Sequence, residues 1–265
     1  MKIKPLKIKT SSYKVENVIT FQIGENKHET ATTYDILLKN SDGLKYDFLL
    51  DRGKISINGS LPDTKFLSIS DDYFSCLFPI HFLVKNEKFI VANFSEINDR
   101  IIRKDKELKS AFSGDGIDYI SSEFLAKTNS EEKMQRFISG LNIVNALQFS
   151  LQKTQEITLA NWNILLISNT LWEGYSTFDI ENIFLEYDAA VQISTEFIEK
   201  LNHFALSQNC EINFTASDEF SSKLHHETKY LNQDLKFIIA TNHIAIKHSS
   251  FEYNEAFTIK SKTAK

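Results

Sequence analysis

The spacing of apolar residues changes twice along the chain, and this change constrains the fold more than any other feature. Over residues 1–94 apolar residues alternate with polar ones, as in Val15 to Ile23, which is typical of half-buried β-strands. Residues 95–206 mainly show helical spacing, and residues 207–265 return to strand-like runs. Because strands do not alternate regularly with helices, a doubly wound parallel sheet is disfavoured. We expect an α+β fold, with antiparallel β-meanders at both ends of the chain and a helical middle section packed on the sheet.

The 265 residues are enough for one large domain or two small ones. No internal repeat, low-complexity tract or linker marks a boundary. We therefore expect a single domain over residues 1–265, β-rich over 1–94, mainly helical over 95–206 and β-rich over 207–265. A two-lobe arrangement, with the meanders in separate lobes around the helical middle, is the alternative.

Turn residues divide the first meander into separate strands. The expected strands are Val15 to Ile23, Thr33 to Lys39, Lys45 to Asp51 and Lys54 to Asn58. The turn between the second and third contains Asp42-Gly43, a strong hairpin signal. Residues 1–9 resemble an edge strand, because lysines discourage edge pairing and Pro5 is tolerated at an edge. The clearest hairpin spans Pro79 to Phe94, with residues 85–88 as its loop.

Three segments have helical spacing. They are Glu96 to Lys109, about Glu131 to Gln152, and Ser194 to Leu206. The expected N-caps are Ser95, then Ser130 or Thr128, then Ser194 or Thr195. Gly140 lies inside the second helix, where it costs about 1 kcal/mol relative to Ala, so close packing is expected there. Residues 160–192 are ambiguous between helix and strand, with Gly174 as a break.

The last third of the chain must turn without glycine or proline, because no glycine follows Gly174 and no proline follows Pro79. Turns are therefore expected at Asn, Asp and Ser. The candidate turns are Ser217-Asp218, Asn232 to Asp234, Asn242 and Asn254. The strand-like runs are Glu211 to Thr215, Leu235 to Ala240, His243 to Lys247 and Ala256 to Lys260. We expect a hairpin that turns near Thr241-Asn242.

Charge and composition restrict the class of protein. The net charge of −5 argues against a nucleic-acid binder, which usually carries a basic face. The longest apolar runs have about four residues, whereas a membrane-spanning helix needs about 20. The basic N-terminus lacks the apolar region of a secretory signal, so a cytoplasmic location is expected. Cys76 and Cys210 match neither a zinc motif nor a disulfide framework, while a single disulfide between them is left open.

A search for chemistry finds no motif. Gly114-Asp115-Gly116 lacks the rest of a phosphate-binding loop and indicates a turn. His28-Glu29 and His226-Glu227 lack the second histidine of a zinc-protease helix. Scattered surface positions are favoured over a metal site for His225, His226, His243 and His248. Asp71-Asp72 adjoins aromatic residues, and Glu173 with Trp172 and Tyr175 could form a sugar-binding patch. A turn beside core aromatic residues is the favoured interpretation of both. The sequence thus predicts no catalytic, cofactor-binding or metal-binding residue, and no cofactor.

The abundance of phenylalanine, 21 residues, is the remaining clue to function. Core filling is the simplest interpretation, while an exposed adhesive face or the lining of an apolar pocket are alternatives. We hypothesise a non-enzymatic protein–protein interaction component, such as an adaptor, an immunity-like protein or an assembly protein, whose partner is another protein. The alternatives are a carrier of a small apolar ligand in a sheet-over-helix cavity and an enzyme with dispersed catalytic residues. The oligomeric state is left open.

Overall fold

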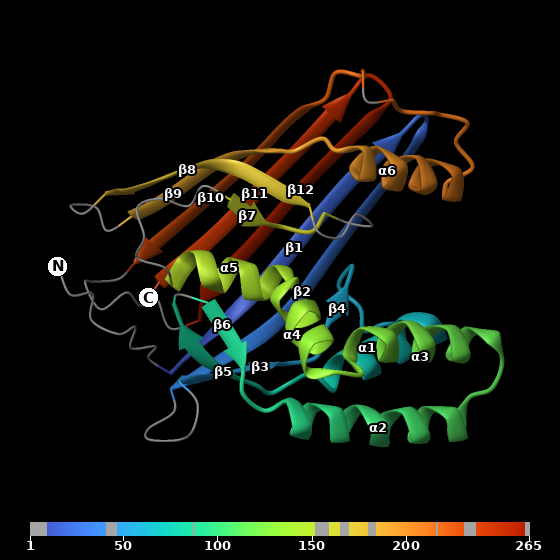
Figure 1. Cartoon of the computed structure of the whole chain (residues 1–265), viewed down its shortest axis with the longest axis vertical. Helices are drawn as coiled ribbons and strands as arrows, with labels where there is room; N and C mark the ends of the chain where they lie inside the picture. The colour runs from blue at the N-terminus through green and yellow to red at the C-terminus, as the bar shows by residue number, and fades with distance from the viewer. Residues whose placement is uncertain are drawn as a thin grey trace. The chain divides into compact units, whose positions relative to one another are not determined.

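A computed structural model of the chain describes residues 10–40, 47–86, 88–151, 159–164, 170–179, 184–215, 217–230 and 237–262. Its antiparallel strands join one sheet in the order β6-β5-β3-β2-β1-β12-β11-β10-β9-β8-β7, and β4 pairs with β2. The first and last parts of the chain are thus neighbours, since β1 lies beside β12 (Figure 1). The α+β class, with strands at both ends of the chain and helices between them, is confirmed.

The elements have the following bounds. The first six strands are β1 (Ser11–Ile23), β2 (Asn26–Asn40), β3 (Phe48–Arg52), β4 (Ser56–Ile57), β5 (Ile80–Lys85) and β6 (Lys88–Val91). The others are β7 (Leu159–Asn161), β8 (Leu171–Asp179), β9 (Phe184–Val191), β10 (Ser221–Tyr230), β11 (Phe237–His248) and β12 (Phe251–Ser261). The helices are α1 (Lys65–Ser75), α2 (Phe94–Ala111), α3 (Asp115–Thr128), α4 (Glu131–Ser139), α5 (Asn142–Leu151) and α6 (Thr195–Ser207).

The chain divides into two compact units. Unit 1 comprises Met1–Lys14, Thr33–Ser139 and Ser261–Lys265, and unit 2 comprises Val15–Thr32 and Gly140–Lys260. The strands β1 and β2 are each continuous, but their residues are divided between the two units. That the chain behaves as a single domain stays a prediction.

Unit 1 combines short strands with the helices α1 to α4. Phe48, Phe82 and Phe89 form its strand core, with ring centroids 5.0–5.5 Å apart. The side chain of Gln135 ties α4 to β6, since it accepts a hydrogen bond from the Val91 amide at 2.8 Å and donates to the Phe89 carbonyl at 3.0 Å. A second cluster joins the helices and contains Ile69, Tyr73, Leu108, Ile117 and Ile120.

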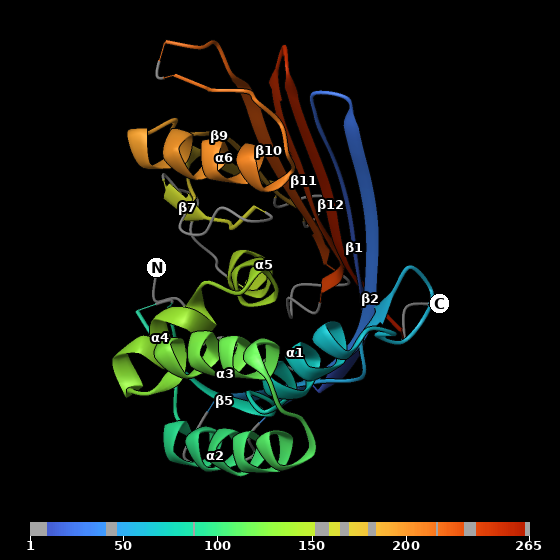
Figure 2. The same ribbon diagram turned by 90° about the vertical axis from the view of Figure 1, so that its right-hand side faces the viewer.

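Unit 2 is a sheet with α5 and α6 on one face (Figure 2). Buried and partly exposed residues alternate along β10 and β12, as expected for strands with one covered face. The ring of Phe149 on α5 lies 5.2 Å from that of His226, and the ring of Phe204 on α6 lies 5.1 Å from that of Phe21. The face that contacts these helices is called the inner face below, and the opposite face the outer face.

Several helix boundaries differ from expectation. The helix expected over 131–152 is two helices, because α4 ends at Ser139 and α5 begins at Asn142. The Gly140 carbonyl accepts a hydrogen bond from the Asn163 side chain at 2.6 Å, which occupies the break. The helices α1 and α3 were not predicted, and the described residues of the ambiguous segment 160–192 belong mostly to the strands β7, β8 and β9. Ser95 does not cap α2, which begins one residue earlier.

The hairpin and the third expected helix are confirmed. The strands β5 and β6 pair from Phe82↔Val91 to Lys85↔Lys88, so the loop is shorter than expected. The helix α6 begins after Ser194, whose Oγ accepts a hydrogen bond from the Phe197 amide at 3.1 Å.

The last third of the chain departs most from expectation. The strand β10 was not predicted, and the expected strand over 211–215 is irregular instead. No hairpin turns at Thr241-Asn242, because β11 runs straight through it and the chain turns at Ser249-Ser250. Asn254 lies within β12 and Gly174 within β8, so neither interrupts a strand.

Some expectations fall on residues outside the described ranges. These are the edge strand over 1–9, the turn over 41–43 and the turn over 232–234. None of the helices in the described part of the chain has both the length and the apolar character needed to cross a membrane.

Candidate functional site

The four histidines considered as metal ligands do not converge. The surface position expected for His226 is wrong, because this residue is fully buried on the inner face. Its neighbour His225 points to the outer face, since alternate residues of a strand face opposite ways. His243 lies directly opposite His225 on β11 and is exposed. His248 stacks on Phe220 at a ring distance of 5.0 Å.

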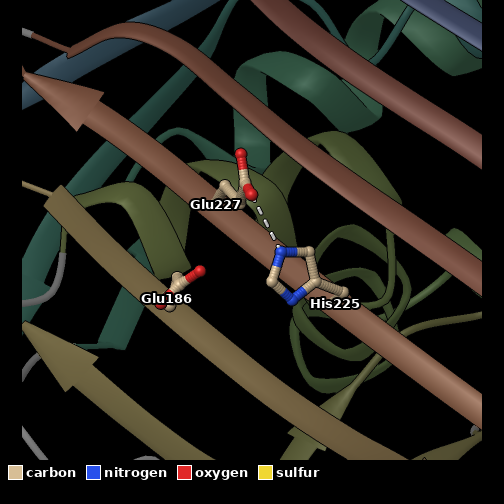
Figure 3. A group of neighbouring side chains, drawn as sticks. All are labelled: Glu186, His225 and Glu227. Carbon is tan, nitrogen blue, oxygen red and sulfur yellow. Dashed lines mark hydrogen bonds and ion pairs between the residues drawn. The ribbon is translucent and has the colours of Figure 1, made fainter.

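His225 instead gathers carboxylates from two neighbouring strands. The register of β9 and β10 places Glu186 opposite Glu227 and Asp188 opposite His225. His225 Nε2 lies 3.0 Å from Glu227 Oε1, and His225 Nδ1 lies 2.9 Å from Asp188 Oδ1. Figure 3 shows that Glu186, His225 and Glu227 project from neighbouring strands toward a common region. We call Glu186, Asp188, His225 and Glu227 the acidic histidine cluster.

The cluster is partly shielded from solvent. The side chains of His225, Asp188 and Glu227 are 21%, 30% and 37% exposed. Burial alone lowers the pKa of His225, but its hydrogen bonds to Glu227 and Asp188 and their negative charge outweigh burial and raise the pKa above its usual value. Lys223 Nζ lies 3.6 Å from Asp188 Oδ1. The potential metal ligands are Glu186, His225 and Glu227, whose ligand atoms all lie within 4.8 Å of one another.

The second candidate is a groove between helices of unit 1. The helix α3 packs against both α1 and α4 (Figure 2). The groove has a volume of about 260 Å³ and is lined by Phe66, Ser70, Tyr73, Phe74, Tyr119, Ile120, Glu123, Phe124, Lys127 and Phe137. We call it the aromatic groove. Phe66 is 55% exposed and Tyr119 is 61% exposed, so large aromatic side chains stand in solvent beside it.

The floor of the aromatic groove is held by ring contacts and by hydrogen bonds. The ring of Phe124 lies 5.4 Å from that of Tyr73 and 5.8 Å from that of Phe137. Tyr73 donates its hydroxyl to Asp105 Oδ1 at 2.7 Å. Burial and this bond raise the pKa of Tyr73 to about 12, so the hydroxyl stays a donor at neutral pH. The floor is therefore preformed.

The turns expected at two other positions are wrong, because Asp71 and Asp72 lie in α1 and Glu173 lies in β8. Asp71 pairs with Arg52 at 2.6 Å. Trp172 is buried on the inner face, whereas Tyr175 is 66% exposed, so the two do not form one sugar-binding patch. Cys76 and Cys210 are both free thiols, which excludes a disulfide.

Comparisons with known proteins do not assign the chain to a family. No family model matches the chain, and no curated protein matches it. One solved structure, titled "Lipid-protein interactions in lipovitellin", is similar with a TM-score of 0.48 and 10% sequence identity. The similarity covers 96% of this chain but only 25% of that one, so this chain spans about a quarter of its length. A likeness at this level establishes neither fold nor function.

Proposed function

We propose that this protein is a non-enzymatic protein–protein interaction component that binds its partner at the aromatic groove. The observation that carries this proposal is the exposure of Phe66 and Tyr119 beside a preformed aromatic floor. Aromatic residues are enriched at interface cores and among the residues that dominate binding energy. A rigid floor also lowers the entropic cost of binding.

The size of the groove favours a protein side chain over a carried small molecule. Ligand pockets usually measure about 300–1,000 Å³, whereas this groove measures about 260 Å³. Its lining on α3 runs from Tyr119 to Lys127, eight residue steps or about 12 Å of helix. We therefore infer that the occupant is a short amphipathic helix that inserts one or two large apolar side chains, a common mode of peptide recognition.

The charged residues that line the aromatic groove, Glu123 and Lys127, have no net charge together. Glu123 and Lys127 form an ion pair with Nζ and Oε2 3.8 Å apart on α3. An apolar partner segment is therefore better matched than a strongly charged one. The adaptor, immunity-like or assembly role, the cytoplasmic location and the lack of nucleic-acid binding stay predictions.

A displayed peptide library tests the proposal and requires no assumption about which protein is the partner. Selection on the full chain should enrich peptides with apolar residues at helical spacing. The double variant Phe66→Ser/Tyr119→Ser should bind these peptides at least tenfold more weakly, since hot-spot residues commonly contribute more than about 1.4 kcal/mol each.

Ile102→Ser is the matched control, because Ile102 is 43% exposed on α2 but does not line the groove. This variant should bind the selected peptides as the wild type does. If no peptide motif emerges, or if the double variant binds the selected peptides unchanged, the aromatic groove is not the binding site.

A further inference from the structure

We propose that Glu186, His225 and Glu227 bind a divalent transition-metal ion, with Zn²⁺ as the best match, and that Asp188 orients His225 for this task. The site lies on the outer face of unit 2, on β9 and β10. It is independent of the aromatic groove and goes beyond the proposed binding function.

The orientation of His225 is the first argument. Its Nδ1 lies 2.9 Å from Asp188 Oδ1, so Nδ1–H can donate to that carboxylate and leave the Nε2 lone pair for a metal. Metal-bound histidines usually donate their second ring N–H in this way, often to a carboxylate. Asp188 is itself within 3.6 Å of Lys223 Nζ, which further restrains it.

The separation of the ligand atoms is the second argument. Zinc bonds of about 2.0–2.2 Å place neighbouring ligand atoms roughly 3.0–3.5 Å apart. His225 Nε2 and Glu227 Oε1 are already 3.0 Å apart, and all three ligand atoms lie within 4.8 Å of one another. Rotation about the side-chain bonds of Glu186 can close the remaining gap, because a glutamate has three rotatable bonds and the strand backbone need not move.

The charge of the cluster is the third argument. Glu186 and Glu227 are directly opposite in the register, and like charges at such positions destabilise a sheet. The nearby lysines offset only part of the negative charge of the cluster. Lys223 faces Asp188, and the Lys229 ammonium lies 5.8 Å from the centre of the Phe184 ring. A divalent cation held between the two glutamates would offset their repulsion.

The donor set indicates which ion fits. One imidazole nitrogen and two carboxylate oxygens suit Zn²⁺, because imidazole favours zinc and other late transition metals over Mg²⁺ or Ca²⁺. His225 and Glu227 retain 21% and 37% of their side-chain exposure, so water can complete the coordination. A protonated His225 that bridges Asp188 and Glu227 fits the same contacts, and the experiment must therefore detect the metal itself.

Isothermal titration calorimetry with Zn²⁺ on the full chain, after treatment with a chelator, tests the proposal. We expect one zinc ion per chain, retained in excess Mg²⁺. The near-isosteric variants Glu186→Gln and Glu227→Gln should each weaken binding at least tenfold. Asp188→Asn should weaken it by about 10- to 100-fold, the usual effect of losing an orienting partner. His243→Gln is the matched control, because this exposed histidine faces His225 without belonging to the ligand set.

A second measurement keeps the test independent of variant folding. In ¹⁵N NMR spectra of the wild type, zinc should shift the Nε2 resonance of His225 and leave that of His243 in place. The proposal fails if the wild type binds no zinc, if the glutamine variants bind it unchanged, or if His243→Gln loses it equally. Peptide binding at the aromatic groove is measured separately, so failure of one proposal does not affect the other.

Discussion

Glu255 is a carboxyl group in the core of unit 2, where it is 2% exposed on the inner face of β12. Its Oε2 accepts hydrogen bonds from the Tyr253 hydroxyl at 2.8 Å and from Trp162 Nε1 at 3.2 Å. The Asn142 side chain donates to Oε1 at 3.4 Å. Burial raises the pKa of Glu255 more than these donors lower it, so the net pKa is above its usual value. Glu255 therefore links the stability of unit 2 to pH.

We predict that the wild type loses stability as the pH rises above about 4.5 and that Glu255→Gln does not show this loss. A carboxyl whose pKa is raised by folding stabilises the fold below its unfolded pKa, and this contribution is lost as the pH rises through the folded pKa. Glutamine cannot ionise, and its oxygen can still accept from Tyr253 and Trp162. Urea denaturation of both proteins between pH 4.5 and 8 measures the difference, up to about 1.4 kcal/mol for each unit by which the pKa is raised.

The comparison between the two proteins is needed because His226 acts in the opposite direction. Burial lowers the pKa of His226 to about 4, so its neutral form stabilises the fold above pH 6.5 and this contribution is lost as the pH falls toward 4. That contribution is common to both proteins and cancels in their difference. Parallel stability profiles for the wild type and Glu255→Gln would show that Glu255 does not titrate in this range.

At the scale of the elements, buried polar residues explain why β10 could not be recognised in the sequence. Its inner face carries His226 and Thr228 among its buried residues, so the alternation of apolar and polar residues that marks a strand is lost. The His226 ring satisfies both of its nitrogens, with Asn242 Oδ1 at 2.9 Å and Thr228 Oγ1 at 2.7 Å. The same pairing buries Asn242 inside β11, where the sequence predicts a turn.

The middle section, expected to be mainly helical, could be predicted only in part, because it also contains the strands β7, β8 and β9. Ser194 precedes a strongly periodic segment, and the expected cap and helix are both present. The helix α3 has a weaker pattern and begins at Gly114-Asp115-Gly116, a sequence that indicates a turn. Since α3 supplies half of the residues that line the aromatic groove, the groove could not be located from the sequence. An exposed face is only one of the alternatives that the phenylalanine content leaves open.

Gly174 is required by the close approach of β8 and β9. A Cβ atom at this position would overlap the Asp188 carbonyl oxygen and lie 2.6 Å from Ala189 Cα. We predict that Gly174→Ala destabilises the protein by several kcal/mol, because the atoms in contact belong to the backbone of β9 and cannot move away as a side chain could. Thermal or urea unfolding measures the change.

Gly116→Ala is the matched control, since its Cβ would meet nothing within 4 Å and Gly116 lies in α3. Alanine should there be neutral or stabilise by up to about 1 kcal/mol. Equal stabilities for Gly174→Ala and the wild type would mean that β8 and β9 are not held this closely.

At the scale of the whole molecule, the acidic histidine cluster depends on strand register rather than on any local motif. Glu186 and Glu227 are far apart in sequence and meet only because β9 and β10 pair in a particular register. A shift by one residue would turn His225 to the inner face. The segments Glu186 to Asp188 and His225 to Glu227 each place two polar side chains on one face, but nothing in the sequence indicates that they are paired.

The division of β1 and β2 between the two units bears on how the molecule unfolds. Each strand is continuous, yet its residues belong partly to unit 1 and partly to unit 2. Melting either strand would therefore remove pairing partners from both units, and we predict one cooperative unfolding transition for the full chain. Differential scanning calorimetry should give equal calorimetric and van't Hoff enthalpies.

The variant Ser194→Ala tests whether the two units unfold together. It removes the N-cap hydrogen bond of α6 in unit 2 and should lower the free energy of unfolding by about 1 kcal/mol. For a chain of this size that cost lowers the melting temperature by roughly 2–4 °C. If the units unfold together, the free energy of opening measured by amide hydrogen exchange should fall by the same amount in α2 of unit 1 as in α6 of unit 2. Two resolved transitions, of which only one moves in Ser194→Ala, would instead establish two lobes that unfold independently and would replace the single-domain prediction.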